Sequence, residues 1–291
     1  MAKSPRPLTG KVVAITGGAR GIGRATAAAL VRKGARVAIG DVDTELAERA
    51  AVELGGGTIA LPLDVTDRVS FERFLDEIER QLGPLDVLIN NAGIMQLGRF
   101  AEEHDDVTVR QVDINLHGVL TGSKLALQRF LPRGRGHLVN IASTAGKAGV
   151  PGGVTYSATK HAVVGLTEAI RGEVRDSGVE TSVVMPVPVN TELAAGLVSG
   201  RGLTATVEPE QVADAIVDAL ERPRHDVYVP RAIAVGVRLG ALLPRRLGEA
   251  LGRSAKTDRI LADADPAARA AYEQRAAASG ARRERVHAES G

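Results

Sequence analysis

The chain has no cysteine and no tryptophan among its 291 residues, and aromatic residues make up only 2% of it. Without thiols the protein has no disulfides, no thiolate nucleophile and no cysteine-ligated metal. Proteins that read nucleic acids by stacking bases need aromatic side chains, which are scarce here. The histidines show no carboxylate pattern that suggests a metal site. We therefore expect neither a nucleic-acid partner nor a bound metal.

Long apolar runs are also missing. No stretch of 18 or more apolar residues suggests a membrane span, and the opening MAKSPRPLTGK lacks the apolar core of a signal peptide. These features predict a cytoplasmic protein. Residues 231–291 carry 12 basic and 7 acidic side chains in a chain of net charge +2. The basic character therefore belongs to the C-terminal segment and does not indicate a nucleic-acid-binding body.

Short apolar runs alternate with helical patterns along most of the chain. Strands are predicted at 11–17, 36–41, 58–66, 85–93, 137–143, 181–186 and 226–230. Apolar strands alternating with helices are typical of an α/β protein with a doubly wound, Rossmann-like parallel sheet. We divide the chain into an N-terminal tail (1–10), one dinucleotide-binding catalytic domain (11–230) and an amphipathic helical extension (231–291). Past Pro266 the extension has the composition of a weak helix or a frayed tail.

The first predicted strand leads directly into the glycine-rich stretch TGGARGIG. Glycines at 17, 21 and 23 allow a tight turn and let the backbone approach a pyrophosphate at the start of the next helix. Asp41, at the end of the second strand, can bond ribose hydroxyls and would repel a 2′-phosphate. Arg20 is the counter-argument, since a basic side chain in the loop could reach that phosphate. On balance, we expect NAD rather than NADP.

Tyr156 and Lys160 are four residues apart in TYSATK, so both side chains project from one face of a helix. The simplest interpretation is structural: a half-buried aromatic ring beside a lysine that keeps its charge in water. A phenol beside an ammonium also suits proton transfer, because the positive charge favours the phenolate.

Six motifs in order support the second interpretation: TGGARGIG, LDVTD at 63–67, NNAG at 90–93, the asparagine of DINLHG at 113–118, Ser143 in NIAS, and YSATK. With them the chain resembles the short-chain dehydrogenase/reductase family, in its short single-domain branch, over residues 11 to about 230. The resemblance implies that Tyr156 is the general acid and base and that Ser143 bonds the substrate oxygen. Lys160 would hold the nicotinamide ribose and lower the pKa of Tyr156. Asn115 would lie at a helix irregularity whose carbonyl holds a proton-relay water.

The same resemblance implies a set of cofactor-binding residues along the cleft. They are Gly17, Arg20, Gly21, Ile22, Gly23, Asp41, Asp64, Val65, Asn91, Ala92, Gly93, Tyr156, Lys160, Val189 and Thr191. Asp64 and Val65 would lie near the adenine, and Asn90 is expected to help shape the adenosine pocket. Val187 stands where the family usually has glycine, which predicts a shifted backbone beside the nicotinamide.

These observations predict an NAD-dependent oxidoreductase that interconverts a secondary alcohol and a ketone. The substrate is expected to be hydrophobic, because residues 193–207 carry few charges. One alternative is an NADPH-dependent 3-oxoacyl thioester reductase. Another is a dinucleotide-binding regulator without turnover. An epimerase or dehydratase is disfavoured by the glycine spacing.

Assembly and the extension leave more than one interpretation open. Helices around 105–131 and 157–175 resemble those that pair in family dimers and tetramers, so we expect a homodimer or homotetramer. The segment AIAVGVRLGALLPRRLGEAL could cover an apolar pocket, pack on a partner subunit or contact anionic lipid. An ordinary packed amphipathic helix is the preferred interpretation of this segment.

Overall fold

Seven parallel strands form the sheet in the computed structural model, which describes residues 4–197, 205–240, 244, 246 and 259–278. The strand order is β3-β2-β1-β4-β5-β6-β7. The strands are β1 (Val12–Thr16), β2 (Arg36–Asp41), β3 (Ile59–Pro62), β4 (Val87–Asn90), β5 (Gly136–Ile141), β6 (Val179–Pro186) and β7 (Asp226–Val229). The predicted doubly wound parallel sheet is therefore confirmed.

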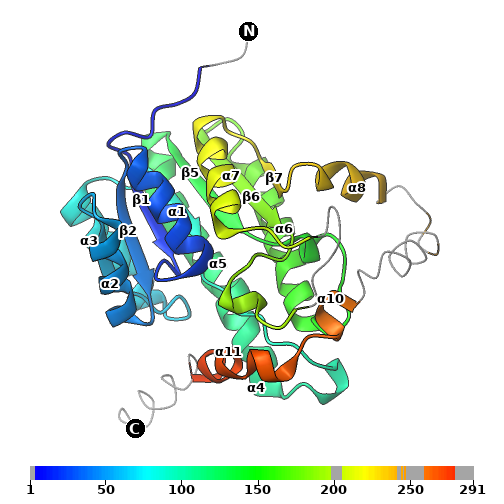
Figure 1. Cartoon of the computed structure of the whole chain (residues 1–291). Helices are drawn as coiled ribbons and strands as arrows, with labels where there is room; N and C mark the ends of the chain where they lie inside the picture. Colours follow the sequence, from blue (N-terminus) through cyan, green and yellow to red (C-terminus); the bar gives the residue numbers. More distant parts are fainter. Residues whose placement is uncertain (1–3, 198–204, 241–243, 245, 247–258, 279–291) are drawn as a thin grey trace.

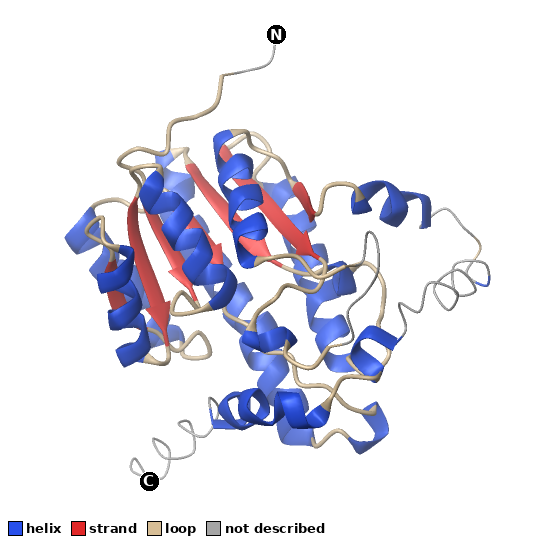
Figure 2. Cartoon of the chain, viewed as in Figure 1, coloured by secondary structure: helices blue, strands red, loops and turns tan. Residues whose placement is uncertain are grey.

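Helices cover both faces of this sheet (Figures 1 and 2). The α-helices are α1 (Gly21–Arg32), α2 (Thr44–Leu54), α3 (Arg68–Leu82), α4 (Asp105–Val112), α5 (Gly118–Phe130), α6 (Val154–Glu173), α7 (Pro209–Glu221), α8 (Ile233–Gly240), α10 (Arg259–Ala262) and α11 (Pro266–Ala278). Buried side chains of α1, α2 and α7 pack on one face of the sheet, while those of α3, α5 and α6 pack on the other.

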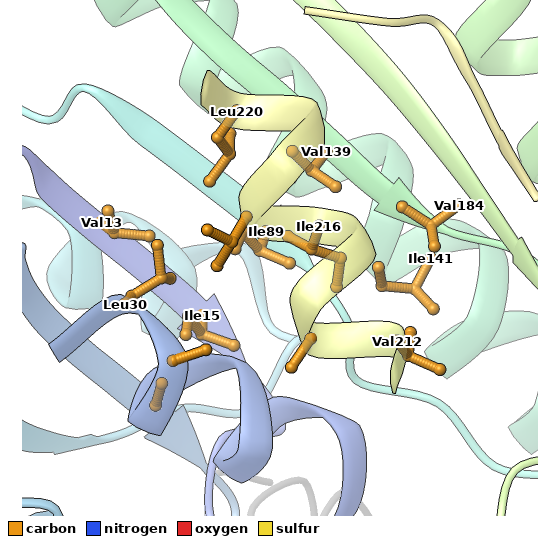
Figure 3. Packing of buried hydrophobic residues seen from close by; sticks show 14 of the residues in the cluster. Val13, Ile15, Leu30, Ile89, Val139, Ile141, Val184, Val212, Ile216 and Leu220 are labelled. Carbon is orange, nitrogen blue, oxygen red and sulfur yellow. The ribbon is translucent and has the colours of Figure 1, made fainter. Parts of the chain in front are cut away.

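Side-chain alternation along the strands explains why both faces are buried. In β1, Val13 and Ile15 belong to the core under α1 and α7, whereas Val12 and Ala14 belong to the core on the opposite face. Figure 3 shows Leu30 of α1 and the apolar side chains of α7 directed at the first of these cores. Each central strand thus stabilises two layers of helices.

The chain changes direction across the sheet between β1 and β4. It runs outward through β2 and β3, then returns to place β4 beside β1 before continuing to β7. The helices that follow β1 and β4 therefore lie on opposite faces, and the strand ends open between them. Such a switch point, at the carboxyl ends of the strands, is where doubly wound proteins bind ligands.

The predicted strands at 58–66 and 85–93 differ most in length, since β3 ends at Pro62 and β4 ends at Asn90. The Asp64 carboxylate accepts bonds from the backbone N–H and the hydroxyl of Thr66, and the Asp67 side chain caps α3. These local bonds turn the chain away from the sheet.

The division into tail, domain and extension stays a prediction, although the described parts of the extension are helical. In the range 231–258, the described residues include α8, while 241–243, 245 and 247–258 lie outside the described part. Helix α11 forms over Pro266–Ala278, where the sequence offered a weak helix or a frayed tail. No helix of the described residues is long and apolar enough to cross a membrane.

The core under α7 generates a stability prediction. Ile216 is fully buried between α7 and the sheet. Ile216→Ala should lower the free energy of unfolding by about 2–5 kcal/mol, because the lost contacts leave a cavity. Val52→Ala, at an 83% exposed position in α2, is the control and should change it by less than about 0.5 kcal/mol. Chemical denaturation followed by circular dichroism measures both, and equal losses would contradict this description of the core.

Candidate functional site

A cleft of about 1170 Å³ lies at the carboxyl ends of the strands. Its walls come from the glycine-rich loop and from the loops after β2, β3, β4, β5 and β6. The side of α6 that carries Tyr156 and Lys160 and the helices α8, α10 and α11 complete them. Drug-sized pockets usually measure about 300–1,000 Å³, so this cleft has room for a large ligand.

The glycine-rich loop is shaped by backbone conformations and contacts that side chains would prevent. Gly17 and Gly21 have φ of +65° and +53°, in the left-handed region. A Cβ on Gly23 would lie 2.2 Å from the Gly17 carbonyl oxygen. Gly17 and Gly21 line the cleft along with Arg20 and Ile22. Gly23 is absent from the described lining and instead allows α1 to pack against the loop.

The NNAG loop after β4 is bonded to the end of β1. The Asn91 side-chain amide donates to the carbonyls of Thr16 and Gly17 at 2.9 and 3.0 Å. The Thr16 hydroxyl in turn accepts from the backbone N–H groups of Asn91 and Ala92, both at 2.9 Å. Thr16 was not recognised from the sequence, although a hydroxyl at the end of the first strand was a signal available there.

Asn90 does not take the role expected for it. Its side-chain amide donates to the Asn140 side chain at 2.9 Å, and it is buried between β4 and β5 away from the described cleft lining. Consecutive residues of a strand point to opposite faces, so Asn90 and Asn91 could not both face the cleft. Asn91, Ala92 and Gly93 do line it.

Asp41 ends β2 at the mouth of the cleft. Its carboxylate accepts from the backbone N–H groups of Ala19 and Asp43, both at 3.2 Å. Burial raises the pKa of Asp41, while these two bonds and the nearby Arg20 act in the opposite direction. The Arg20 guanidinium is itself paired, at 2.7 Å with Asp43 and at 3.2 Å with Glu192. Acidic groups therefore surround the one base in the glycine-rich loop.

Four further residues of the expected cofactor set also line the cleft: Asp64, Val65, Val189 and Thr191. Thr191 lies beside the glycine-rich loop, since a Cβ on Gly21 would be 3.3 Å from its methyl group. Val187 belongs to the core cluster under α7 and also lines the cleft, and its N–H donates to the Val229 carbonyl at 2.9 Å. The valine side chain therefore packs between core and cleft, and the expected shift of the backbone beside the nicotinamide stays a prediction.

Helix α6 brings Tyr156 and Lys160 into the cleft, where Ser143 meets them from the end of β5. Tyr156 and Lys160 are only 8% and 5% exposed. The Lys160 ammonium donates to the Ile141 carbonyl at 3.0 Å and lies 5.7 Å from the centroid of the Tyr156 ring. Ser143 lines the cleft with them and is close enough to Tyr156 to act on the pKa of its phenol. The three predicted side chains therefore converge at one point.

The protonation equilibria of this trio differ from the sequence expectation. Burial raises the pKa of Tyr156 to about 12, with a smaller opposing effect from the Ser143 hydroxyl. Burial lowers the pKa of Lys160 to about 8. The shift of the Tyr156 pKa thus runs opposite to the lowering expected from Lys160, and its largest cause is burial.

Asn115 lies in a π-helical turn, Asp113–His117, between α4 and α5. The expected helix irregularity is therefore present. The Asn115 side chain accepts from the Ile94 N–H and donates to the Ile94 carbonyl, both at 2.8 Å. It also donates to the Thr159 hydroxyl at 3.3 Å. Asn115 is fully buried and stands behind the described cleft lining rather than in it.

The C-terminal helices contribute residues that the sequence did not assign to the site. These lining residues are Ile260, Leu261, Tyr272, Arg275 and Ala276. Arg269 is buried beside them. A signal was present, since Arg269, Tyr272 and Ala276 share one helix face at intervals of three and four residues. The segment for which covering an apolar pocket was one of the options contributes Ile233 and Val237 of α8.

A doubly wound sheet with a glycine-rich loop at its switch point, and a Ser, Tyr and Lys set beside it, defines a dinucleotide-dependent oxidoreductase. The chain belongs to the short-chain dehydrogenase family, whose model matches residues 11–202.

The relatives and solved structures are consistent with this class. A sorbitol dehydrogenase of Cereibacter sphaeroides is 39% identical over 186 residues, which cover 64% of this chain and 73% of that protein. A glycine betaine reductase of Emericella nidulans is 35% identical over 231 residues, which cover 75% of this chain but only 18% of that longer protein. A short chain dehydrogenase/reductase from Burkholderia phymatum, solved in complex with NAD, superimposes with a TM-score of 0.74 at 27% identity. That match covers 81% of this chain and 94% of the other.

Proposed function

We propose that the protein is an NAD-dependent oxidoreductase that interconverts a secondary alcohol and a ketone on a hydrophobic small molecule. The observation that carries the proposal is the convergence of Ser143, Tyr156 and Lys160 in the cleft that the glycine-rich loop opens into. The NAD complex of the Burkholderia phymatum protein and the name of the sorbitol dehydrogenase support the cofactor and the reaction type.

The residues present fit a dinucleotide. The side-chain-free backbone of Gly17 and Gly21, at the start of α1, would hold the pyrophosphate. Asp41 would hold the adenosine ribose, with Asp64 and Val65 near the adenine. Lys160 would hold the nicotinamide ribose, with Val189 and Thr191 beside the carboxamide. NAD bound there would accept the hydride of an alcohol, and NADH would supply one to a ketone.

Proton transfer is assigned to Tyr156. With a pKa of about 12, its phenol is protonated at neutral pH and is ready to donate to a substrate oxygen. Ser143, which lines the cleft beside the phenol, would position that oxygen. Lys160 would supply a positive charge beside the phenol whenever it is protonated. Asn115 fixes the loop at Ile94 and, through the carbonyl of its π-helical turn, would continue the proton path toward solvent.

Apolar side chains around Tyr156 support a hydrophobic substrate. Met95, Ala145, Ile260 and Leu261 form a buried cluster with the tyrosine, and Leu193 and Leu197 pack against it. Within the expected lid region at 193–207, residues 198–204 lie outside the described part, so the support comes from Leu193 and Leu197.

The alternatives have less support. The thioester reductase was favoured by Arg20, which could reach a 2′-phosphate, and by the basic C-terminal segment, but Asp43 and Glu192 pair with that arginine. The regulator without turnover depended on Val187, which the core accommodates. Assembly into a homodimer or homotetramer through the region of α4, α5 and α6 stays part of the proposal.

The first test replaces the phenol. Tyr156→Phe should reduce kcat by at least about a hundredfold, since proton transfer by a positioned side chain contributes about 10²–10⁴-fold. The dissociation constant for NAD, measured by calorimetry, should change less than about twofold. Tyr228→Phe is the matched control, because Tyr228 is also buried but is not part of the cleft lining. Turnover by Tyr156→Phe equal to the control would refute the assignment.

The second test concerns cofactor choice. Asp41→Asn keeps an acceptor for one of the Ala19 and Asp43 N–H groups and removes the charge that repels a 2′-phosphate. At about 1–4 kcal/mol of repulsion, the preference for NAD over NADP should narrow about fivefold or more in kcat/KM. Asp176→Asn, at an exposed position after α6, should leave the ratio unchanged. An unaltered ratio in Asp41→Asn would remove this carboxylate from cofactor selection.

The third test is the pH dependence. Oxidation requires the phenolate, whose fraction rises about tenfold per pH unit below a pKa of about 12. Between about pH 6 and 8, kcat/KM for alcohol oxidation should therefore rise steeply. Ketone reduction, which requires the protonated phenol, should stay constant over the same range. Oxidation that slows with rising pH would contradict the raised pKa of Tyr156.

A further inference from the structure

The two C-terminal helices dock against the cleft through close backbone contacts. The Asp265 N–H donates to the Gly196 carbonyl at 2.8 Å. A Cβ on Gly152 would lie 2.7 Å from the Cα of Ala262, and one on Gly196 would lie 2.7 Å from the Asp265 carbonyl oxygen. Glycines at these two positions therefore let α10 and α11 approach the loops on both sides of the substrate end of the cleft. In Figure 1 these helices lie at the end of the molecule to which the strands point.

Arg269 holds this arrangement together. It is 3% exposed and donates to three backbone carbonyls: Met95 at 2.6 Å, Leu193 at 3.1 Å and Ala195 at 3.0 Å. Glu273, one helical turn later, pairs with it at 3.0 Å. A buried guanidinium is costly unless its donors are satisfied, and here one residue satisfies carbonyls of two separate loops. The contacts make Arg269 a dedicated anchor.

Tyr272 completes the attachment at Met95. Its hydroxyl accepts from the Met95 N–H at 2.7 Å, so side chains of α11 bond both backbone groups of this residue. Met95 is buried in the cluster that contains Tyr156, Ile260 and Leu261. Helix α11 therefore sets where the Met95 side chain stands beside Tyr156.

The surface that these helices present to the cleft is apolar. Ile260, Leu261, Tyr272 and Ala276 line it, while Arg269 donates to backbone carbonyls and to Glu273, and the Tyr272 oxygen accepts from the Met95 N–H. Arg275 is the charged lining residue of α11, and it is paired with Glu192 at 2.8 Å. A substrate hydroxyl placed against Ile260, Leu261 or Ala276 would lose its water without gaining a partner, which costs about 1–3 kcal/mol.

We propose that residues 259–278 form the outer wall of the substrate site. Arg269 is the positioning residue that fastens this wall to the rest of the cleft. The wall selects a substrate whose carbon skeleton is apolar and carries no hydroxyl besides the reacting one. The inference rests on the proposed function and narrows its substrate class to apolar alcohols and ketones, excluding polyols. The family match ends at residue 202, so this wall belongs to the part of the chain outside it.

The test compares two neighbouring alanines of α11. Ala276 is buried at the cleft, whereas Ala277 is exposed on the same helix and is not part of the described lining. Ala276→Leu should weaken binding of 2-decalone, an apolar bicyclic ketone, about tenfold in the presence of NAD. Ala277→Leu should leave it within about twofold. Saturation-transfer NMR measures the binding without requiring turnover.

The second arm tests the anchor. Arg269→Gln should raise the KM for 2-decalone, measured in its reduction with NADH, about tenfold with a smaller change in kcat. It should also reduce the ratio by which the protein binds 2-decalone more tightly than sorbitol. Arg269→Lys should restore part of both effects. The dissociation constant for NAD should stay within about twofold in each variant. If Arg269→Gln fails to fold by circular dichroism, the alanine pair alone decides.

The outcomes separate the two proposals. Equal binding of 2-decalone by both leucine variants, or preferential binding of sorbitol by the unaltered protein, would overturn the wall. Selective binding of 2-decalone by the unaltered protein, weakened by Ala276→Leu but accompanied by no reduction of 2-decalone with NADH and no oxidation of the corresponding alcohol with NAD, would support the wall while refuting the proposed function.

Discussion

The hydrogen bonds between the ends of β1 and β4 are the constraint on which the site depends. The sheet changes direction between these two strands, so their carboxyl ends open into the cleft instead of continuing as a ladder. Thr16 and Asn91 supply the missing partners from side chains, bonding four backbone groups across the gap. Because the glycine-rich loop follows one strand and the NNAG loop follows the other, this tie fixes both sides of the dinucleotide end together.

Burial then acts on the protonation of the residues proposed for catalysis. The same low-dielectric surroundings raise the pKa of Tyr156 and lower that of Lys160, so both groups are pushed toward their neutral forms. The protonated Tyr156 phenol lies beside a Lys160 ammonium whose proton is lost more easily than usual. This arrangement suits donation of a proton by Tyr156 to a substrate oxygen. The cost of burying the lysine is reduced by the Ile141 carbonyl, which also fixes the direction of its side chain. The site is thus arranged by desolvation more than by mutual attraction of the pair.

The sequence predicted the parts of the fold and site that short segments encode. Apolar runs marked the seven strands, and four residues in one helix were enough to place Tyr156 beside Lys160. It failed where the outcome depends on contacts between distant segments. Whether Asn90 or Asn91 faces the cleft depends on which residues of β4 point to which face of the sheet. The pKa of Tyr156 depends on how deeply the folded chain buries its phenol, which no motif reveals. The role of Arg269 depends on carbonyls of residues 95, 193 and 195, which are more than 70 positions away.

The loop after β6 joins the two ends of the cleft. Within it, Glu192 pairs with Arg20 of the glycine-rich loop and with Arg275 of α11, while the next residue gives its carbonyl to Arg269. The exposed ion pairs are individually weak, but the buried bonds of Arg269 are not exposed to the same screening. Movement of this loop at the cofactor end would therefore be transmitted to the wall at the substrate end. The residues proposed for chemistry lie within the family match and the wall lies outside it, so this loop is where reaction and selectivity meet.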